Sequence, residues 1–83
     1  MYTLVYYVKE TEGSKVFEHK YVGEEFRMRN NALHYLREIV KDYYINEGYA
    51  TENIVSGLNC YKSEKTNKGD RKIMETRIKV EKI

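Results

Sequence analysis

The spacing of apolar residues changes twice along the chain, and this change limits the folds available to it. Apolar and polar residues alternate near both ends of the sequence, as on a half-buried strand, whereas between Asn31 and Glu47 apolar residues recur every three or four positions. At 83 residues the chain has room for one small core. The pattern therefore predicts a single α+β domain over residues 1–83, with the order ββαββ, a four-stranded and mostly antiparallel sheet, and one amphipathic helix packed on one face.

Two hairpins account for the four predicted strands. The first joins Tyr2–Lys9 to Lys15–Val22 through a polar turn that contains a glycine. The second joins a weaker strand at Ile54–Tyr61 to a stronger one at Lys72–Ile83 through a turn at Thr66–Asp70. Because the last strand alternates with lysine and glutamate, which discourage further pairing, we expect it at an edge of the sheet. The first strand is apolar on both faces and is expected in the interior.

The predicted helix has one apolar face and one polar face. Its apolar side chains fall within an arc of about 140° when each residue turns by about 100°, and they are Ala32, Leu33, Leu36, Ile39, Val40, Tyr43 and Tyr44. This arc is the side that we expect to pack on the sheet.

Polar residues and a glycine mark the two ends of this helix. Asn30 or Asn31 is placed to cap the start by accepting a backbone N–H bond. Gly48 is placed as the left-handed residue after the end, which would let Tyr49 pack back on Tyr44.

The first strand carries the main functional prediction. Leu4, Tyr6 and Val8 share one face, while Val5 and Tyr7 share the other. One helix covers only one face of a sheet, so Val5 and Tyr7 are predicted to form a protein-binding surface. Tyrosine suits this role because it offers a large contact area with few rotatable bonds. We expect a small non-catalytic protein-interaction module of the inhibitor or adaptor type, acting through this face or by self-association as a homodimer. A second interpretation is that lysine and arginine stems cover this face.

The turn of the second hairpin supports an alternative function. Between Lys62 and Lys72 the chain holds five basic residues and two acidic ones, and a charged loop of this kind can contact phosphates. The formal net charge of +2, from 15 basic and 13 acidic residues, is small for a nucleic-acid-binding protein. The alternative is a nucleic-acid-binding module that uses Tyr7 or Tyr61 beside four phosphate-contacting residues, Lys65, Lys68, Arg71 and Lys72.

No sequence motif predicts catalysis. His19 and His34 lack a serine, cysteine or carboxylate at a spacing that indicates a nucleophile and its base. Cys60 is interpreted as a small buried side chain. The sequence also lacks a glycine-rich phosphate loop and any Cys and His pair with metal-ligand spacing. We therefore expect a protein that is not an enzyme and has no catalytic residues, metal site or cofactor.

Composition gives an expected location. The uncharged runs are far shorter than the ~18 apolar residues of a membrane span, and the start lacks a basic leader before its apolar run. A single cysteine forms no internal disulfide. We expect a cytoplasmic protein without membrane contact. Nine tyrosines with no tryptophan or proline are typical of AT-rich genomes, such as those of many low-GC bacteria and their phages, and on composition alone we expect a phage or mobile-element origin.

Overall fold

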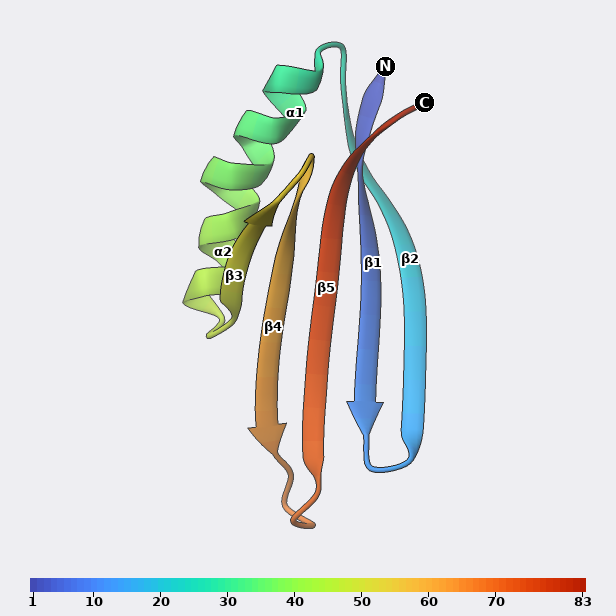
Figure 1. Ribbon diagram of the computed structural model, residues 1–83, viewed down its shortest axis with the longest axis vertical. Helices are drawn as coiled ribbons and strands as arrows, with labels where there is room; N and C mark the ends of the chain where they lie inside the picture. Colours follow the sequence, from blue (N-terminus) through green and yellow to red (C-terminus); the bar gives the residue numbers. More distant parts are fainter.

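Five antiparallel strands and one helical segment make up the protein, and the computed structural model describes all 83 residues (Figure 1). The strand order in the sheet is β2-β1-β5-β4-β3, and each pair of neighbours is antiparallel. The α+β class is therefore confirmed, with five strands in place of the four predicted. The strands are β1 (Tyr2–Glu12), β2 (Lys15–Phe26), β3 (Ala50–Ile54), β4 (Gly57–Lys65) and β5 (Arg71–Lys82).

The additional strand results from a tight hairpin in the segment where the sequence pattern predicts a single weak strand. β3 ends at Ile54 and β4 begins at Gly57, so Val55 and Ser56 alone form the turn. Ser56 has a φ of 57°, a left-handed conformation that residues other than glycine rarely adopt. The first residue of β4 is a glycine, Gly57, because a Cβ at this position would lie 2.3 Å from the carbonyl oxygen of Ile78.

The prediction that the last strand lies at an edge is wrong. β5 pairs with β1 on one side and β4 on the other. Its Thr76, Ile78 and Val80 are buried, while Arg77 between them is exposed. The alternating charges of β5 therefore mark the solvent face of a one-sided sheet and do not mark an edge. The expected interior position of β1 is confirmed, and the edges are β2 and β3.

The helical segment runs from Arg29 to Asn46 with its end as predicted but an earlier start. It consists of α1 (Arg29–Tyr35), a π-helical turn at Leu36–Val40, and α2 (Lys41–Asn46). The N-cap residue is Met28 and no side chain caps the start. The predicted asparagine cap is wrong because both asparagines lie inside the first helical turn.

A Schellman closure ends the helix, as the sequence predicts. Gly48 has a φ of 87°. Its amide donates to the carbonyl of Ile45 over 3.0 Å, and the amide of Tyr49 donates to the carbonyl of Tyr44 over 2.9 Å. The rings of Tyr44 and Tyr49 then meet edge to face, with their centroids 5.0 Å apart.

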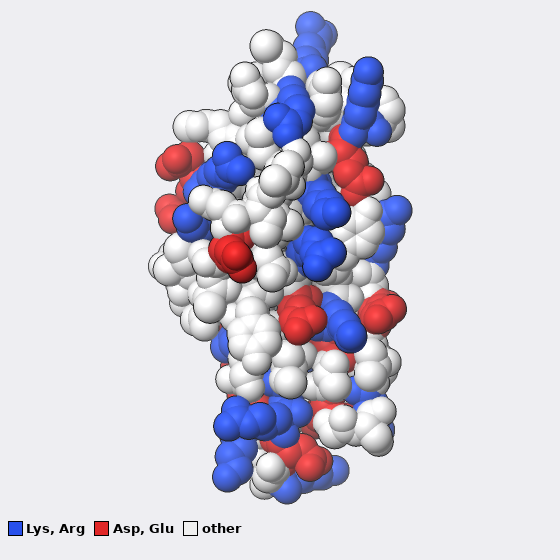
Figure 2. All heavy atoms as spheres, viewed as in Figure 1, with Lys and Arg blue, Asp and Glu red and all other residues white.

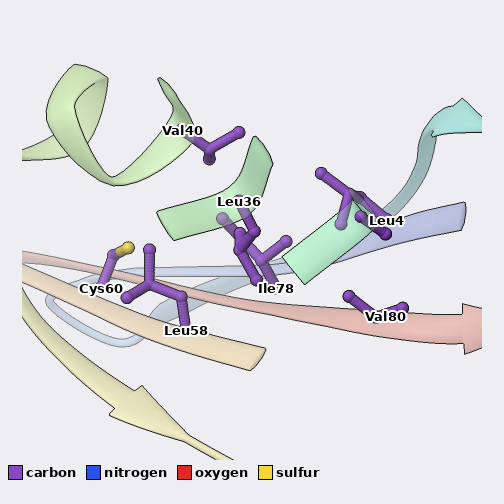
Figure 3. Close-up of a cluster of buried hydrophobic side chains, with 8 residues drawn as sticks. Leu4, Leu36, Val40, Leu58, Cys60, Ile78 and Val80 are labelled. Carbon is purple, nitrogen blue, oxygen red and sulfur yellow. The ribbon is translucent and has the colours of Figure 1, made fainter. Parts of the chain in front are cut away.

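The core lies between the helix and the sheet (Figure 3). Three helical residues of the predicted arc, Ala32, Leu36 and Val40, are buried in it, whereas Ile39 and Tyr43 are more than half exposed. The sheet therefore covers only part of the apolar face of the helix. The other buried members of this core are Leu4, Leu58, Cys60, Ile78 and Val80.

The strands extend well beyond the helix. The molecule is 46 Å long, whereas the helical segment measures about 27 Å at about 1.5 Å per residue. In Figure 1 the turns of the β1–β2 and β4–β5 hairpins project past the end of α2. This end of the sheet therefore lacks a helical layer on either face.

Candidate protein-interaction site

Val5 lies on the sheet face opposite the helix, as predicted, but its side chain is covered. It is only 4% exposed. Its partners across β2 and β5 are Val22 and Lys79. Long lysine stems can cover apolar neighbours while their ammonium groups remain in water. The expectation that Val5 faces solvent is therefore corrected, and this residue offers almost no contact area.

Tyr7 lies near Val5 on the same face, where polar neighbours surround it. It is 37% exposed. Its hydroxyl donates a 2.5 Å hydrogen bond to the Glu81 carboxylate, and this bond raises the pKa of Tyr7 above its usual value. The Lys20 ammonium lies 5.7 Å from the centre of its ring. Tyr7 thus already has partners for its hydroxyl and its ring within the chain.

A shallow hollow surrounds Tyr7, and charged side chains dominate its lining. They carry both signs, since four cations stand beside two carboxylates. Polar side chains that neutralise one another leave little apolar area for a protein partner. The charged residues of this lining are Lys9, Glu18, Lys20, Glu75, Arg77 and Lys79.

The four predicted phosphate-contacting residues lie at the β4–β5 turn but do not form one surface. Lys65 and Arg71 are opposite one another on the two strands, and strand alternation places Lys72 on the other face. Arg71 also donates to the Ser63 hydroxyl over 3.1 Å. Lys68 lies in the turn itself. Figure 2 shows acidic side chains among the basic ones at this end of the molecule.

An apolar surface lies on the helix side of the sheet, where side chains of β2 and of the helix are exposed. Tyr6 lines a groove of about 260 Å³ together with Tyr35, Ile39 and Tyr43, and every residue of its lining is aromatic or aliphatic. Tyr21 of β2 lies directly opposite Tyr6 of β1. We call this region the β2–helix surface, and it comprises Tyr6, Phe17, His19, Tyr21, Ile39 and Tyr43.

The aromatic residues of β2 extend this surface toward the first hairpin turn. The rings of His19 and Tyr21 stack with their centroids 6.1 Å apart. Phe17 follows two residues before His19 and therefore points to the same side. Phe17 and Tyr21 are each more than half exposed. These side chains form one continuous row along the outer strand of the sheet.

The inner wall of the groove is fixed in place by packing. Burial raises the pKa of Tyr6 well above its usual value, and the nearby Glu24 carboxylate raises it further. The ring of Tyr35 packs on Phe26, 5.4 Å between centroids, and its hydroxyl donates to Glu24 over 3.4 Å. The groove therefore has a firm base beneath the exposed side chains of Ile39 and Tyr43.

The sequence pattern predicts the strand and the helix that carry these residues but does not bring them together in one site. The strand expected at Lys15–Val22 is confirmed, and its pairing with β1 puts Phe17, His19 and Tyr21 on one face. The site requires that β2 is the outer strand and that Ile39 and Tyr43 are on the exposed side of the helix. Both features depend on tertiary packing. The available sequence signal is the absence of proline from β2 and the aromatic side chains at alternate positions from Phe17 to Tyr21.

Comparison with protein-family models, curated proteins and solved structures finds no match to this chain. Neither the length nor the hydropathy of any helix is sufficient to cross a membrane. No three histidine, cysteine, aspartate or glutamate side chains are grouped as a metal site.

Cys60 is a buried core residue, as expected. It is fully covered and forms no disulfide. Burial raises the pKa of its thiol to about 11, which keeps it protonated near neutral pH.

Proposed function

We propose that this chain is a small non-catalytic protein-interaction module, of the inhibitor or adaptor type, whose contact surface is the β2–helix surface. The observation that carries the proposal is the exposure of large apolar side chains on two neighbouring elements. Phe17 and Tyr21 of β2 and Ile39 and Tyr43 of the helix are each more than half exposed. A cluster of this kind on a soluble domain is typical of a contact surface.

The residue types of this surface suit reversible contact. Tyr6, Tyr21 and Tyr43 each combine a large apolar ring with a hydroxyl that water can satisfy when no partner is bound. The groove between Tyr6 and the helix is concave and apolar, and pockets of this kind receive the aromatic or aliphatic anchors of a partner. A cytoplasmic location is part of the proposal, because the core of this protein holds without a disulfide.

Paired surface variants test the proposal. Phe17→Ser combined with Tyr21→Ser removes the exposed rings of β2 and should abolish specific capture of other proteins from a lysate, together with any self-association seen by sedimentation velocity. Val55→Ser is the matched control, because Val55 is 91% exposed but lies in the β3–β4 turn. Binding that survives in the double variant, or that is lost equally in the control, would reject this surface.

A nucleic-acid-binding module is the second candidate function. Strand alternation supports it, because Tyr7, Tyr61, Lys65 and Arg71 share the face opposite the helix. The intervening carboxylates oppose it, since they repel a phosphate backbone.

Oligonucleotide titration at two salt concentrations separates the candidates. If phosphate contacts carry the binding, affinity falls steeply between about 50 and about 200 mM salt, and Lys65→Ala with Arg71→Ala reduces the slope. No binding at the lower salt concentration would remove this candidate.

A further inference from the structure

We infer that the partner of this surface is a second copy of the same chain, joined antiparallel through the outer edge of β2, with His19 of one copy opposite His19 of the other. The pairing rests on the proposed interaction function and specifies its partner. It joins two five-stranded sheets into one continuous sheet.

The outer edge of β2 is long and regular. β2 is an end strand of the sheet, and from Lys15 to Val22 it pairs with β1 without interruption. The register shift of this pair comes only after Val22. Natural edge strands are usually shortened, bulged, charged or blocked by proline. The chain has no proline, and the charges of this stretch, such as Glu18 and Lys20, are of both signs. The opposite edge, β3, has five residues and is therefore a much shorter template.

The sequence of β2 is complementary to itself in this register. Antiparallel pairing centred on His19 places Val16 opposite Val22, and Phe17 opposite Tyr21. It also places Glu18 opposite Lys20. Each of these pairs occurs twice because the pairing is symmetric. Apolar, aromatic and opposite-charge pairs of this kind are the contacts that stabilise neighbouring strands.

Other registers are less favourable. Shifting the pairing by two residues in one direction places Glu18 opposite Glu18, and the opposite shift places Lys20 opposite Lys20. Like charges directly opposite one another destabilise a strand pair. A shift of one residue brings side chains of opposite faces together. Charge and face alternation therefore select the register centred on His19.

The same register joins the apolar surfaces of the two copies. Phe17 and Tyr21 lie on the helix side of β2, so antiparallel pairing puts both helices on the same side of the combined sheet. The aromatic row of one copy then continues into that of the other. In each copy the groove that Ile39 and Tyr43 form with Tyr6 adjoins this row, because Tyr6 lies opposite Tyr21.

Charge reversal tests the register. Glu18→Lys places lysine opposite Lys20 in both copies, and Lys20→Glu places glutamate opposite Glu18. Each single variant should weaken the dimer about tenfold or more. The double variant Glu18→Lys/Lys20→Glu should restore it, and an equimolar mixture of the two single variants should form a mixed dimer. Sedimentation velocity over a concentration series measures each constant.

A charge reversal on the other edge, Glu52→Lys in β3, is the matched control and should leave the dimer unchanged. Circular dichroism checks that each variant is folded. If the single reversals leave the dimer dissociation constant unchanged, or if the double variant does not restore it, the register is overturned. A wild-type monomer at every concentration overturns the pairing. In that case, capture of another protein that depends on Phe17 and Tyr21 leaves the proposed function standing, and absence of such capture rejects both.

Discussion

Single residues determine where this fold departs from its sequence pattern. Gly57 interrupts an apolar run, and the pattern therefore suggests that a strand is weakened there. In the structure Gly57 is the first residue of β4, at a point where the backbone of β5 comes close. Ser56 takes a left-handed conformation normally signalled by glycine or asparagine. A sequence pattern cannot reveal either fact, because one depends on a tertiary contact and the other on a strained turn. The burial of Val5 is likewise hidden from a sequence pattern, because it depends on residues of the neighbouring strands β2 and β5.

Substituting Gly57 tests this close approach. In Gly57→Ala the new Cβ would lie 2.3 Å from the carbonyl oxygen of Ile78, so β4 and β5 must separate. We expect a loss of about 1–3 kcal/mol in the free energy of unfolding, measured by urea denaturation. Gly69→Ala is the comparison for backbone strain without a clash, since Gly69 has open space around it but a φ of 86° that alanine disfavours. A loss below about 0.5 kcal/mol in Gly57→Ala would contradict the close approach.

At the scale of the elements, periodicity predicts the helix and four strands, but it does not predict their neighbours. The helix and both long hairpins follow from local patterns and turns, which the Schellman closure at Gly48 illustrates. The order of strands depends on packing, and the charges of β5 fit both an edge and a solvent face. The candidate site shares this limit, because Phe17 and Tyr21 become a surface only once β2 is outermost.

Two substitutions test which face of the helix packs on the sheet. Leu36 is completely buried in the core, so Leu36→Ala should lower the free energy of unfolding by about 2–5 kcal/mol. Ile39→Ala lies on the exposed flank and should cost less than about 1 kcal/mol. Urea denaturation measures both. Equal losses would mean that the helix packs with a different face toward the sheet.

The whole molecule is a single sheet with a partial helical layer, and partly buried tyrosines pack against its core. Burial raises the pKa values of Tyr6, Tyr44 and Tyr49 in the folded state. It also raises that of Cys60, to about 11. In the unfolded chain these groups ionise near pH 10.0 for tyrosine and 9.0 for cysteine. Between the two sets of values the folded state binds more protons, so stability falls as pH rises.

This linkage predicts alkaline unfolding. The stabilisation is fully present below about pH 9 and is lost progressively above it, as the unfolded chain releases protons that the folded chain retains. Urea midpoints at a series of pH values measure the fall. Tyr6→Phe should reduce its steepness, because one group with a raised pKa is removed. A pH profile that does not change in Tyr6→Phe would contradict the assignment.

The central claim is that a second copy of this chain pairs with the outer edge of β2. Amide hydrogen exchange resolved along the chain tests this claim most directly. In dilute solution the outward amides of β2 and β3 should both exchange quickly, because both strands lie at edges of the sheet. As protein concentration rises, the amides between Val16 and Val22 should become protected while those of β3 stay unchanged. Protection that never develops in β2, or that develops equally in β3, would contradict the account.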